Sequence, residues 1–168
     1  MNTDRDLVLE LSKSGRLPAP LASNPLAREL GGEILELGTD GGLAVLAFNP
    51  PARFAQGSGV LQGGIVTALL DFAMAFAAHA KLLGDDRGFA TASMNIQFLR
   101  PAPPARYIAR GHIVRAGRKL LFAEAKLVAA EALPMVADPA GSGGPGRNDA
   151  PDRDLIATAS AVFALAER

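Results

Sequence analysis

Asp71 is the residue of this sequence whose type and setting point most strongly to chemistry. It is the only Asp, Glu, Lys or Arg between Arg53 and Lys81, and it lies at the middle of the most apolar stretch, residues 61–83. An ionised carboxylate without a partner is costly to bury, and Thr67, one helical turn earlier, is the near neighbour that can offer a hydroxyl. Asp71 is therefore either a structural residue held by another element, or a general base or nucleophile.

A second group of residues lies at the start of the same stretch, where Gln62 is followed by Gly63 and Gly64. The first amides of a helix have no acceptor within it, and the helix dipole places partial positive charge there. Glycine lets a carbonyl group approach these amides closely, so they could stabilise an oxyanion. The alternative is a tight junction between loop and helix that needs glycine for packing alone.

The spacing of these two groups carries information about assembly. Asp71 follows Gly63 by eight residues, which corresponds to about 12 Å along one helix. That distance is too long for both groups to act on one carbonyl. If both are catalytic, Asp71 of one subunit must face the Gly63 amide of another, and the active unit is at least a dimer.

Thr91, in a predicted strand at 88–99, is a third candidate. It can hydrogen-bond to a water or to Asp71, or it can be an ordinary β-branched strand residue. Alternation along the strand predicts that the side chains facing the helix belong to Ala90, Ala92, Met94, Ile96 and Phe98, with Thr91 on the other side.

Composition excludes several other kinds of site. The chain has no cysteine and two histidines, His79 and His112, neither in a triad or metal-binding pattern, so we expect no metal and no redox cofactor. Lys+Arg and Asp+Glu both number 17, which leaves no net field to attract nucleic acid or a membrane surface. A carboxylate at the centre of residues 61–83 argues against a membrane span, and the N-terminus does not resemble a signal peptide. We therefore expect a cytoplasmic protein.

The elements that position these residues follow from periodicity and turn residues. One long helix is expected at 63–83, and strands are expected at 32–39, 43–49, 88–99, 105–115, 119–130 and 154–165. The helix is apolar on nearly every face, so it must be buried on nearly every face. One helix can satisfy this only if the sheet curves around it. The prediction is an α+β protein with the hotdog fold, a curved antiparallel sheet of about six strands wrapped around one long central helix.

The predicted domain organisation is simple. Residues 1–23 form an N-terminal helix, centred on 3–13, and an irregular proline-containing linker; residues 24–168 form the hotdog domain. Residues 134–153, rich in proline and glycine, are expected to form a flexible insertion. This insertion is either a solvated loop or a flap over the active site.

Three blocks of sequence resemble one family. Residues 59–78, GVLQGGIVTALLDFAMAFAA, resemble the signature of the phenylacetate-degradation (PaaI-type) hotdog acyl-CoA thioesterases. In that family His-Gly-Gly at the helix start is followed, nine residues after the His, by Asp or Glu. Residues 94–102, MNIQFLRPA, resemble the family's next strand, and residues 116–127, AGRKLLFAEAKL, its following hairpin. The resemblance runs from about residue 24 to 130, resumes at 155, and so covers most of the chain.

The resemblance implies a role for each matching residue. Asp71 would activate water or attack the thioester directly, and the Gly63 amide would polarise the thioester carbonyl. Thr91 falls where some members have a Ser or Thr that positions the water, and Gln56 where several carry an Asn near the nucleophile. Gln62 departs from the family, because most members have His there and a glutamine amide cannot carry a proton.

The function implied is hydrolysis of a small or medium acyl-CoA, or an aryl-CoA, by a homodimer or a dimer of dimers. No cofactor is implied beyond the coenzyme A of the substrate. Gly64 is expected to contact the substrate, and Arg118 and Lys119 to meet the CoA phosphates. The alternatives are a non-catalytic acyl-CoA-binding protein, in which Gln62 reflects lost turnover, and a hydratase or dehydratase, which would need a clear Asp/His pair.

Overall fold

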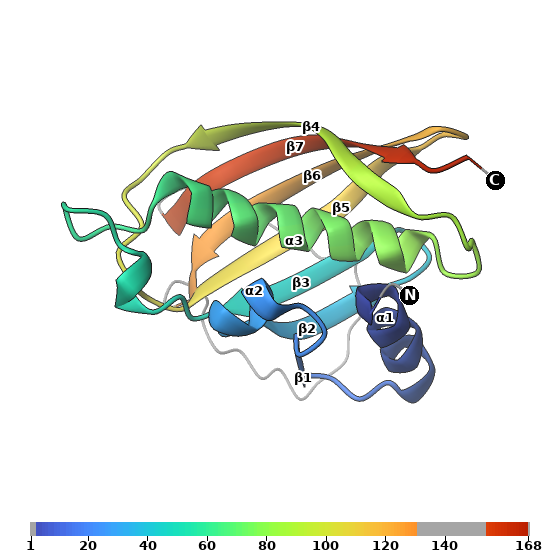
Figure 1. Ribbon diagram of the computed structural model, residues 1–168, viewed down its shortest axis with the longest axis horizontal. Helices are drawn as coiled ribbons and strands as arrows, with labels where there is room; N and C mark the ends of the chain where they lie inside the picture. The colour runs from blue at the N-terminus through green and yellow to red at the C-terminus, as the bar shows by residue number, and fades with distance from the viewer. Residues whose placement is uncertain (1–2, 131–153, 168) are drawn as a thin grey trace, which may run out of the picture.

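The protein folds as one curved sheet around one long helix (Figure 1), in a computed structural model that describes residues 3–130 and 154–167. The strand order is β1-β2-β3-β5-β6-β7-β4, and all neighbours pair antiparallel. The strands are β1 (Ala19–Pro20), β2 (Glu33–Gly38), β3 (Leu43–Phe48), β4 (Phe89–Phe98), β5 (Tyr107–Ala116), β6 (Leu120–Ala129) and β7 (Leu155–Leu165). Helix α3 (Gly63–Lys81) lies in the concave side. The predicted hotdog architecture is confirmed, with seven strands in place of about six.

Helix α3 is the centre of the hydrophobic core. Residues on several of its faces, among them Val66, Leu70 and Phe76, are buried in the main core cluster. Its backbone also comes very close to strand β5, since a Cβ placed on Gly111 would lie 2.3 Å from the Ala73 carbonyl oxygen. No side chain fits there without moving backbone, so glycine at this position allows the helix to rest directly on the sheet.

The segment before β2 is more regular than the sequence suggested. Helix α1 (Thr3–Ser14) agrees with the prediction and buries Val8 and Leu11. The expected irregular linker instead contains strand β1, paired with β2, and it leads into helix α2 (Pro25–Glu29), whose start is capped by the side chain of Asn24. Proline at the first helical position loses no hydrogen bond, so Pro25 can begin this helix.

Strand β4 contains a bulge that the sequence analysis missed. Thr91 pairs with Phe163 and Ser93 pairs with Val162, so Ala92 has no partner of its own on β7. An extra residue in one strand interrupts the regular alternation of its side chains. The predicted division of β4 into two faces therefore holds only beyond the bulge.

The bulge changes which residues of β4 face the helix. Met94 and Ile96 pack against the core as predicted, whereas Ala90 and Ala92 are exposed and the prediction for them is wrong. Thr91, expected on the outer side, lies on the helix side opposite the buried Phe163. The register shift is thus what turns Thr91 toward α3.

Helix α3 is the one helix in the described part of the chain that is long and apolar enough to cross a membrane. Its packing inside the sheet accounts for this composition, because a core helix is apolar for the same reason as a membrane helix. The insertion predicted at 134–153 lies outside the described residues, and the division at residue 23 stays a prediction.

His79, near the end of α3, is buried among aromatic rings. It is 9% exposed, and its ring centroid lies 4.6 Å from that of Phe89 and 6.0 Å from that of Phe76. Burial lowers the pKa of His79 from its ordinary 6.5 to about 4, while Asp4 and Arg5 of α1 act in opposite directions. The folded protein therefore holds this imidazole neutral.

Acid is expected to destabilise the fold through His79. Below pH 6.5 the His79 imidazole binds a proton in the unfolded chain, whereas in the folded protein it binds one only near pH 4. The free energy of unfolding is therefore highest above pH 6.5 and falls as the pH falls from 6.5 to about 4. The loss should approach about 3 kcal/mol. Urea unfolding across this range should show the dependence in the wild type and in His112→Gln, which alters an exposed histidine, and much less in His79→Leu. An unchanged pH dependence in His79→Leu would contradict this assignment.

Candidate active site

Asp71 and Thr91 form a hydrogen-bonded pair between the middle of α3 and strand β4. The Thr91 hydroxyl donates to Asp71 Oδ1 at 3.1 Å. Burial raises the pKa of the Asp71 carboxyl above its ordinary 3.8, and the bond from Thr91 acts against this rise. The pair is therefore a carboxylate of increased basicity with one oxygen held in place, which is a suitable arrangement for accepting a proton.

No other described side chain hydrogen-bonds to Asp71. The hydroxyl of Thr67 donates instead to the Gly63 carbonyl oxygen at 2.8 Å, one turn toward the helix start. Within the described residues no cation pairs with Asp71 either. A partly buried carboxylate with a single hydroxyl partner is poorly satisfied for a purely structural residue.

Thr91→Val is expected to raise the pKa of Asp71 further, because the lost hydrogen bond favours the ionised carboxylate. The pKa can be followed by carbon NMR of the aspartate carboxyl during a pH titration. Thr158→Val is the matched control, since Thr158 lies on the outer face of the sheet. A pKa of Asp71 equal in Thr91→Val and the control would mean that the bond contributes nothing.

The start of α3 presents two backbone amides without an acceptor. The Gln62 carbonyl accepts the amides of Ile65 and Val66, at 2.9 and 3.2 Å, and the Gln62 side chain makes no capping bond. The amides of Gly63 and Gly64 donate to no described residue, and both glycines are exposed. These amides are available to bind a negatively charged oxygen, as the sequence predicts.

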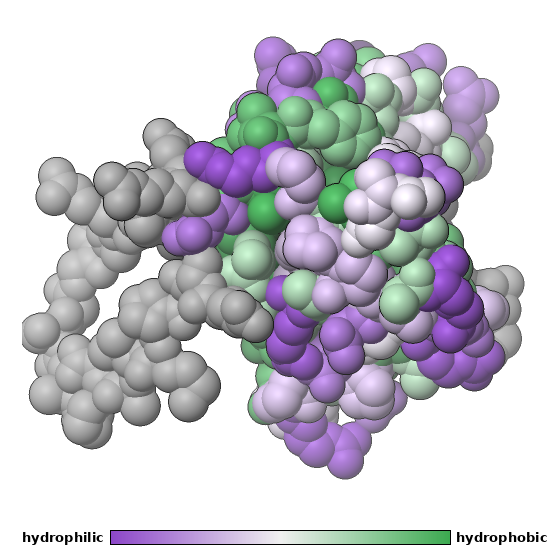
Figure 2. All heavy atoms as spheres, turned by 90° about the vertical axis from the view of Figure 1, so that its left-hand side faces the viewer, coloured by the Kyte–Doolittle hydropathy of each residue, from purple (hydrophilic) through white to green (hydrophobic). Residues whose placement is uncertain are grey.

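A hollow of about 350 Å³ adjoins these amides. Its lining is mostly apolar and consists of Val60, Leu61, Gly63, Val66, Phe98, Leu99, Arg100, Pro101 and Ala102. Figure 2 looks onto this end of the molecule, and hydrophobic surface gathers in its upper part, at the height where β4 ends in Figure 1. Hydrogen-bond donors beside an apolar wall are the usual lining of a small-molecule site.

One chain does not bring the two parts of the predicted site together. Asp71 and Gly63 lie on the same helix, separated by about 12 Å of helical rise. Gln56 also lies apart from Asp71, in the loop before α3, where its side-chain amide donates to the Ser58 hydroxyl at 2.7 Å. The structure thus joins Thr91 to Asp71 and leaves the other predicted catalytic residues near the helix start.

Arg118 and Lys119 lie far from the amides of α3 in the same chain. Arg87, just before β4, donates to the Arg118 carbonyl oxygen at 2.6 Å, and Lys119 pairs with Glu167 at 3.7 Å. They therefore adjoin the first residues of β4, whereas Phe98, at the other end of this strand, adjoins Gly63. The length of β4 separates the two ends by about 30 Å.

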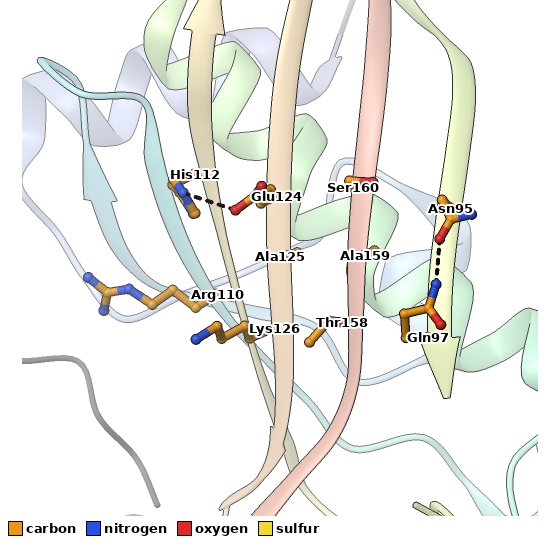
Figure 3. A pocket seen from close by; sticks show the side chains of 10 residues that line it. All are labelled: Asn95, Gln97, Arg110, His112, Glu124, Ala125, Lys126, Thr158, Ala159 and Ser160. Carbon is orange, nitrogen blue, oxygen red and sulfur yellow. Dashed lines mark hydrogen bonds and ion pairs between the residues drawn. The ribbon is translucent and has the colours of Figure 1, made fainter. Parts of the chain in front are cut away.

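The outer face of the sheet carries a second, polar hollow of about 490 Å³ (Figure 3). It contains a histidine–carboxylate pair, His112 and Glu124, with 3.9 Å between His112 Nε2 and Glu124 Oε2. His112 has no acidic residue near it in sequence, and it meets Glu124 only through the pairing of β5 with β6. Both side chains are more than half exposed and lie on the opposite side of the sheet from α3. They do not supply Asp71 with the partner that a hydratase would need.

Among residues 3–130 and 154–167 no group of three His, Cys, Asp or Glu side chains could hold a metal ion. The expectation that no metal takes part remains a prediction.

Comparison with known proteins connects this geometry to a family. Residues 58–134 match the model of the Thioesterase superfamily. This range includes the start of α3, Asp71 and Thr91. No match is found among curated proteins.

Solved structures share the fold over nearly the whole chain. A phenylacetic acid degradation-related protein from Ralstonia eutropha JMP134 is 25% identical, with 94% of this chain and 98% of that chain covered and a TM-score of 0.67. A thioesterase family protein from Silicibacter pomeroyi is also 25% identical, with 96% and 97% covered and a TM-score of 0.68. The PaaI protein of the E. coli phenylacetic acid degradation operon, at 15% identity, covers 99% and 97% with a TM-score of 0.68 and agrees in fold. The chain thus resembles the thioesterase superfamily over residues 58–134 and shares its central helix and curved sheet with hotdog proteins of the PaaI type.

Proposed function

We propose that this protein hydrolyses acyl-CoA thioesters to a carboxylate and free CoA. The observation that carries the proposal is the Asp71–Thr91 pair, a half-buried carboxylate of raised pKa on the central helix of a thioesterase-superfamily fold. A carboxylate with these properties can act as a general base toward water, or as a nucleophile.

The reaction follows from the positions of these groups. As general base, Asp71 removes a proton from water while the water oxygen attacks the thioester carbonyl carbon. The negative charge that develops on the carbonyl oxygen is held by the amides of Gly63 and Gly64, with the Gln62 side chain as a further donor. The tetrahedral intermediate then loses CoA as its thiolate, which takes up a proton, and the acid is left as carboxylate. In the nucleophilic route an Asp71 carboxylate oxygen attacks the carbonyl carbon and CoA leaves as its thiolate, which takes up a proton. Water then hydrolyses the resulting anhydride, which releases the acid and restores Asp71.

The proposal requires at least a homodimer. Strand β4 is an edge of the described sheet, paired only with β7, and an exposed edge can pair with a second chain. Two-fold pairing along β4 would set Asp71 of one chain opposite the helix start of the other and create two equivalent sites. Assembly into a dimer of dimers, and contact of Arg118 or Lys119 with CoA phosphates across the subunits, belong to the same proposal.

The proposal also includes expectations about cofactors, location and partners. We expect no metal or redox cofactor, a cytoplasmic location, and neither nucleic acid nor membrane as partner. Substrate, water and the residues named above are sufficient for the reaction.

Release of CoA thiol from acetyl-, hexanoyl- and benzoyl-CoA, measured with a thiol reagent, tests the proposal. Turnover of at least one is expected, with much weaker activity on the matching N-acetylcysteamine thioesters, which lack the nucleotide. Tight binding without release would favour the acyl-CoA-binding alternative, for which Gln62 at the family's histidine position is the supporting observation. A protein that neither binds these thioesters nor releases CoA from them would contradict both functions.

A further inference from the structure

Phe98, the last residue of β4, has a position that burial in the core does not explain. Its side chain is 57% exposed, the largest exposed fraction among the large hydrophobic residues of the described chain. Its ring nevertheless lies close to the helix start, since a Cβ on Gly63 would lie 3.4 Å from Phe98 Cζ and 3.7 Å from Cε1. The ring therefore stands beside the unpartnered Gly63 amide while most of its surface remains uncovered.

The surroundings of this ring are suited to one kind of group. Phe98 lines the hollow at the helix start together with Val66 and the half-exposed Leu99. An oxygen bound by the Gly63 and Gly64 amides would place its own carbon, and whatever that carbon carries, next to the ring. A carbonyl group followed by an apolar chain can accept from the two amides with its oxygen and pack its chain against the apolar lining of the hollow.

We propose that Phe98 is the specificity-determining residue of this site, whose ring packs against the acyl chain of the thioester and favours medium apolar acyl groups over acetyl. This inference rests on the proposed function and adds the residue that selects the substrate. Contact of the ring with roughly two methylenes of the acyl chain gives about a tenfold preference.

The carbonyl carbon of an acyl-CoA carries the acyl chain on one side and, through sulfur, the pantetheine arm of CoA on the other. Phe98 is proposed to contact the acyl chain. If the ring contacted the pantetheine arm instead, its loss would affect every acyl-CoA equally, because that arm is common to all. If the ring only supported the helix start or the subunit contact, the loss would again be uniform. A change in the ratio of two substrates that differ only in the acyl chain identifies contact with that chain.

The experiment compares kcat/KM for hexanoyl-CoA and acetyl-CoA in the full-length protein and its variants. Phe98→Ala is expected to lower the hexanoyl-to-acetyl ratio about tenfold. Phe122→Ala is the matched control, because Phe122 is also an exposed phenylalanine but lies on the outer face of the sheet. The control is expected to keep the wild-type ratio.

Each outcome supports or overturns the inference. A ratio in Phe98→Ala within twofold of wild type, or an equal loss for both substrates, overturns it while leaving the hydrolase function in place. If circular dichroism or sedimentation shows that Phe98→Ala does not assemble as the wild type does, Phe98→Leu decides, with a smaller fall in the ratio expected and an unchanged ratio overturning the inference. If the wild type binds both thioesters without turnover, the hydrolase proposal fails separately and the ratio of dissociation constants is compared in the same way. A wild type that neither binds nor hydrolyses them overturns both.

Discussion

Replacing Asp71 with asparagine is expected to lower kcat for acyl-CoA hydrolysis by about 10³-fold or more. Asparagine keeps the size and can still accept the Thr91 hydrogen bond. It cannot remove a proton from water or attack a thioester. The loss should therefore appear in kcat, measured as CoA thiol release, with little change in acyl-CoA binding.

The same variant should fold at least as well as the wild type. Because burial raises the pKa of Asp71, the folded protein holds the ionised carboxylate less favourably than water does. A neutral amide removes this cost, so the melting temperature should stay equal or rise. Glu124→Gln, which neutralises a carboxylate on the outer face of the sheet, is the matched control and should keep full activity. Full activity in Asp71→Asn would mean that the catalytic carboxylate lies elsewhere.

Mixing two inactive variants is expected to restore activity, which is the second large effect. Gly63→Pro removes the amide itself, and proline suits the first position of a helix. Gln62 before it has φ −54° and ψ 139°, a conformation that proline allows in its preceding residue. Loss of this donor should cost about 10²–10³ in rate without unfolding the protein.

In a mixed dimer of Asp71→Asn and Gly63→Pro subunits, one site receives both defects and the other receives neither. Random assembly makes about half of the dimers mixed, so roughly one quarter of wild-type activity should return. Co-expression of two differently tagged Asp71→Asn chains is the control and should restore nothing. If mixed dimers form, as shown by tag affinity and mass, and activity stays absent, Asp71 and Gly63 do not share a site across subunits.

The architecture and several residues of the candidate site could be predicted because their signals are local. The apolar run with one charge predicts α3 and singles out Asp71, and the alternating runs predict the six longer strands. The bulge at Ala92 could not be predicted, because nothing in residues 88–99 marks which residue lacks a partner on β7. Since that bulge decides the direction of Thr91, the Asp71–Thr91 bond remained one option among several.

Features that depend on register or on distant packing were also missed. The His112–Glu124 pair exists only because β5 and β6 align these residues across the ladder. The contact of Phe98 with Gly63 joins residues 35 positions apart in sequence and depends on how β4 ends over the helix. In each case the residue type is visible in the sequence, but its partner is set by the three-dimensional arrangement.

The close approach of α3 to Gly111 limits which substitutions this fold can accept. Since even one methyl group at this position would collide with the Ala73 carbonyl, the helix has no freedom to move toward the sheet or to make room by a substitution beneath it. New substrate preferences are therefore expected to arise from substitutions at the end of β4 and in the loop before α3, while the contact between α3 and β5 at Gly111 stays unchanged. In a library of random variants, altered selectivity should concentrate in those two segments, and glycine should be retained at 111 in every active clone.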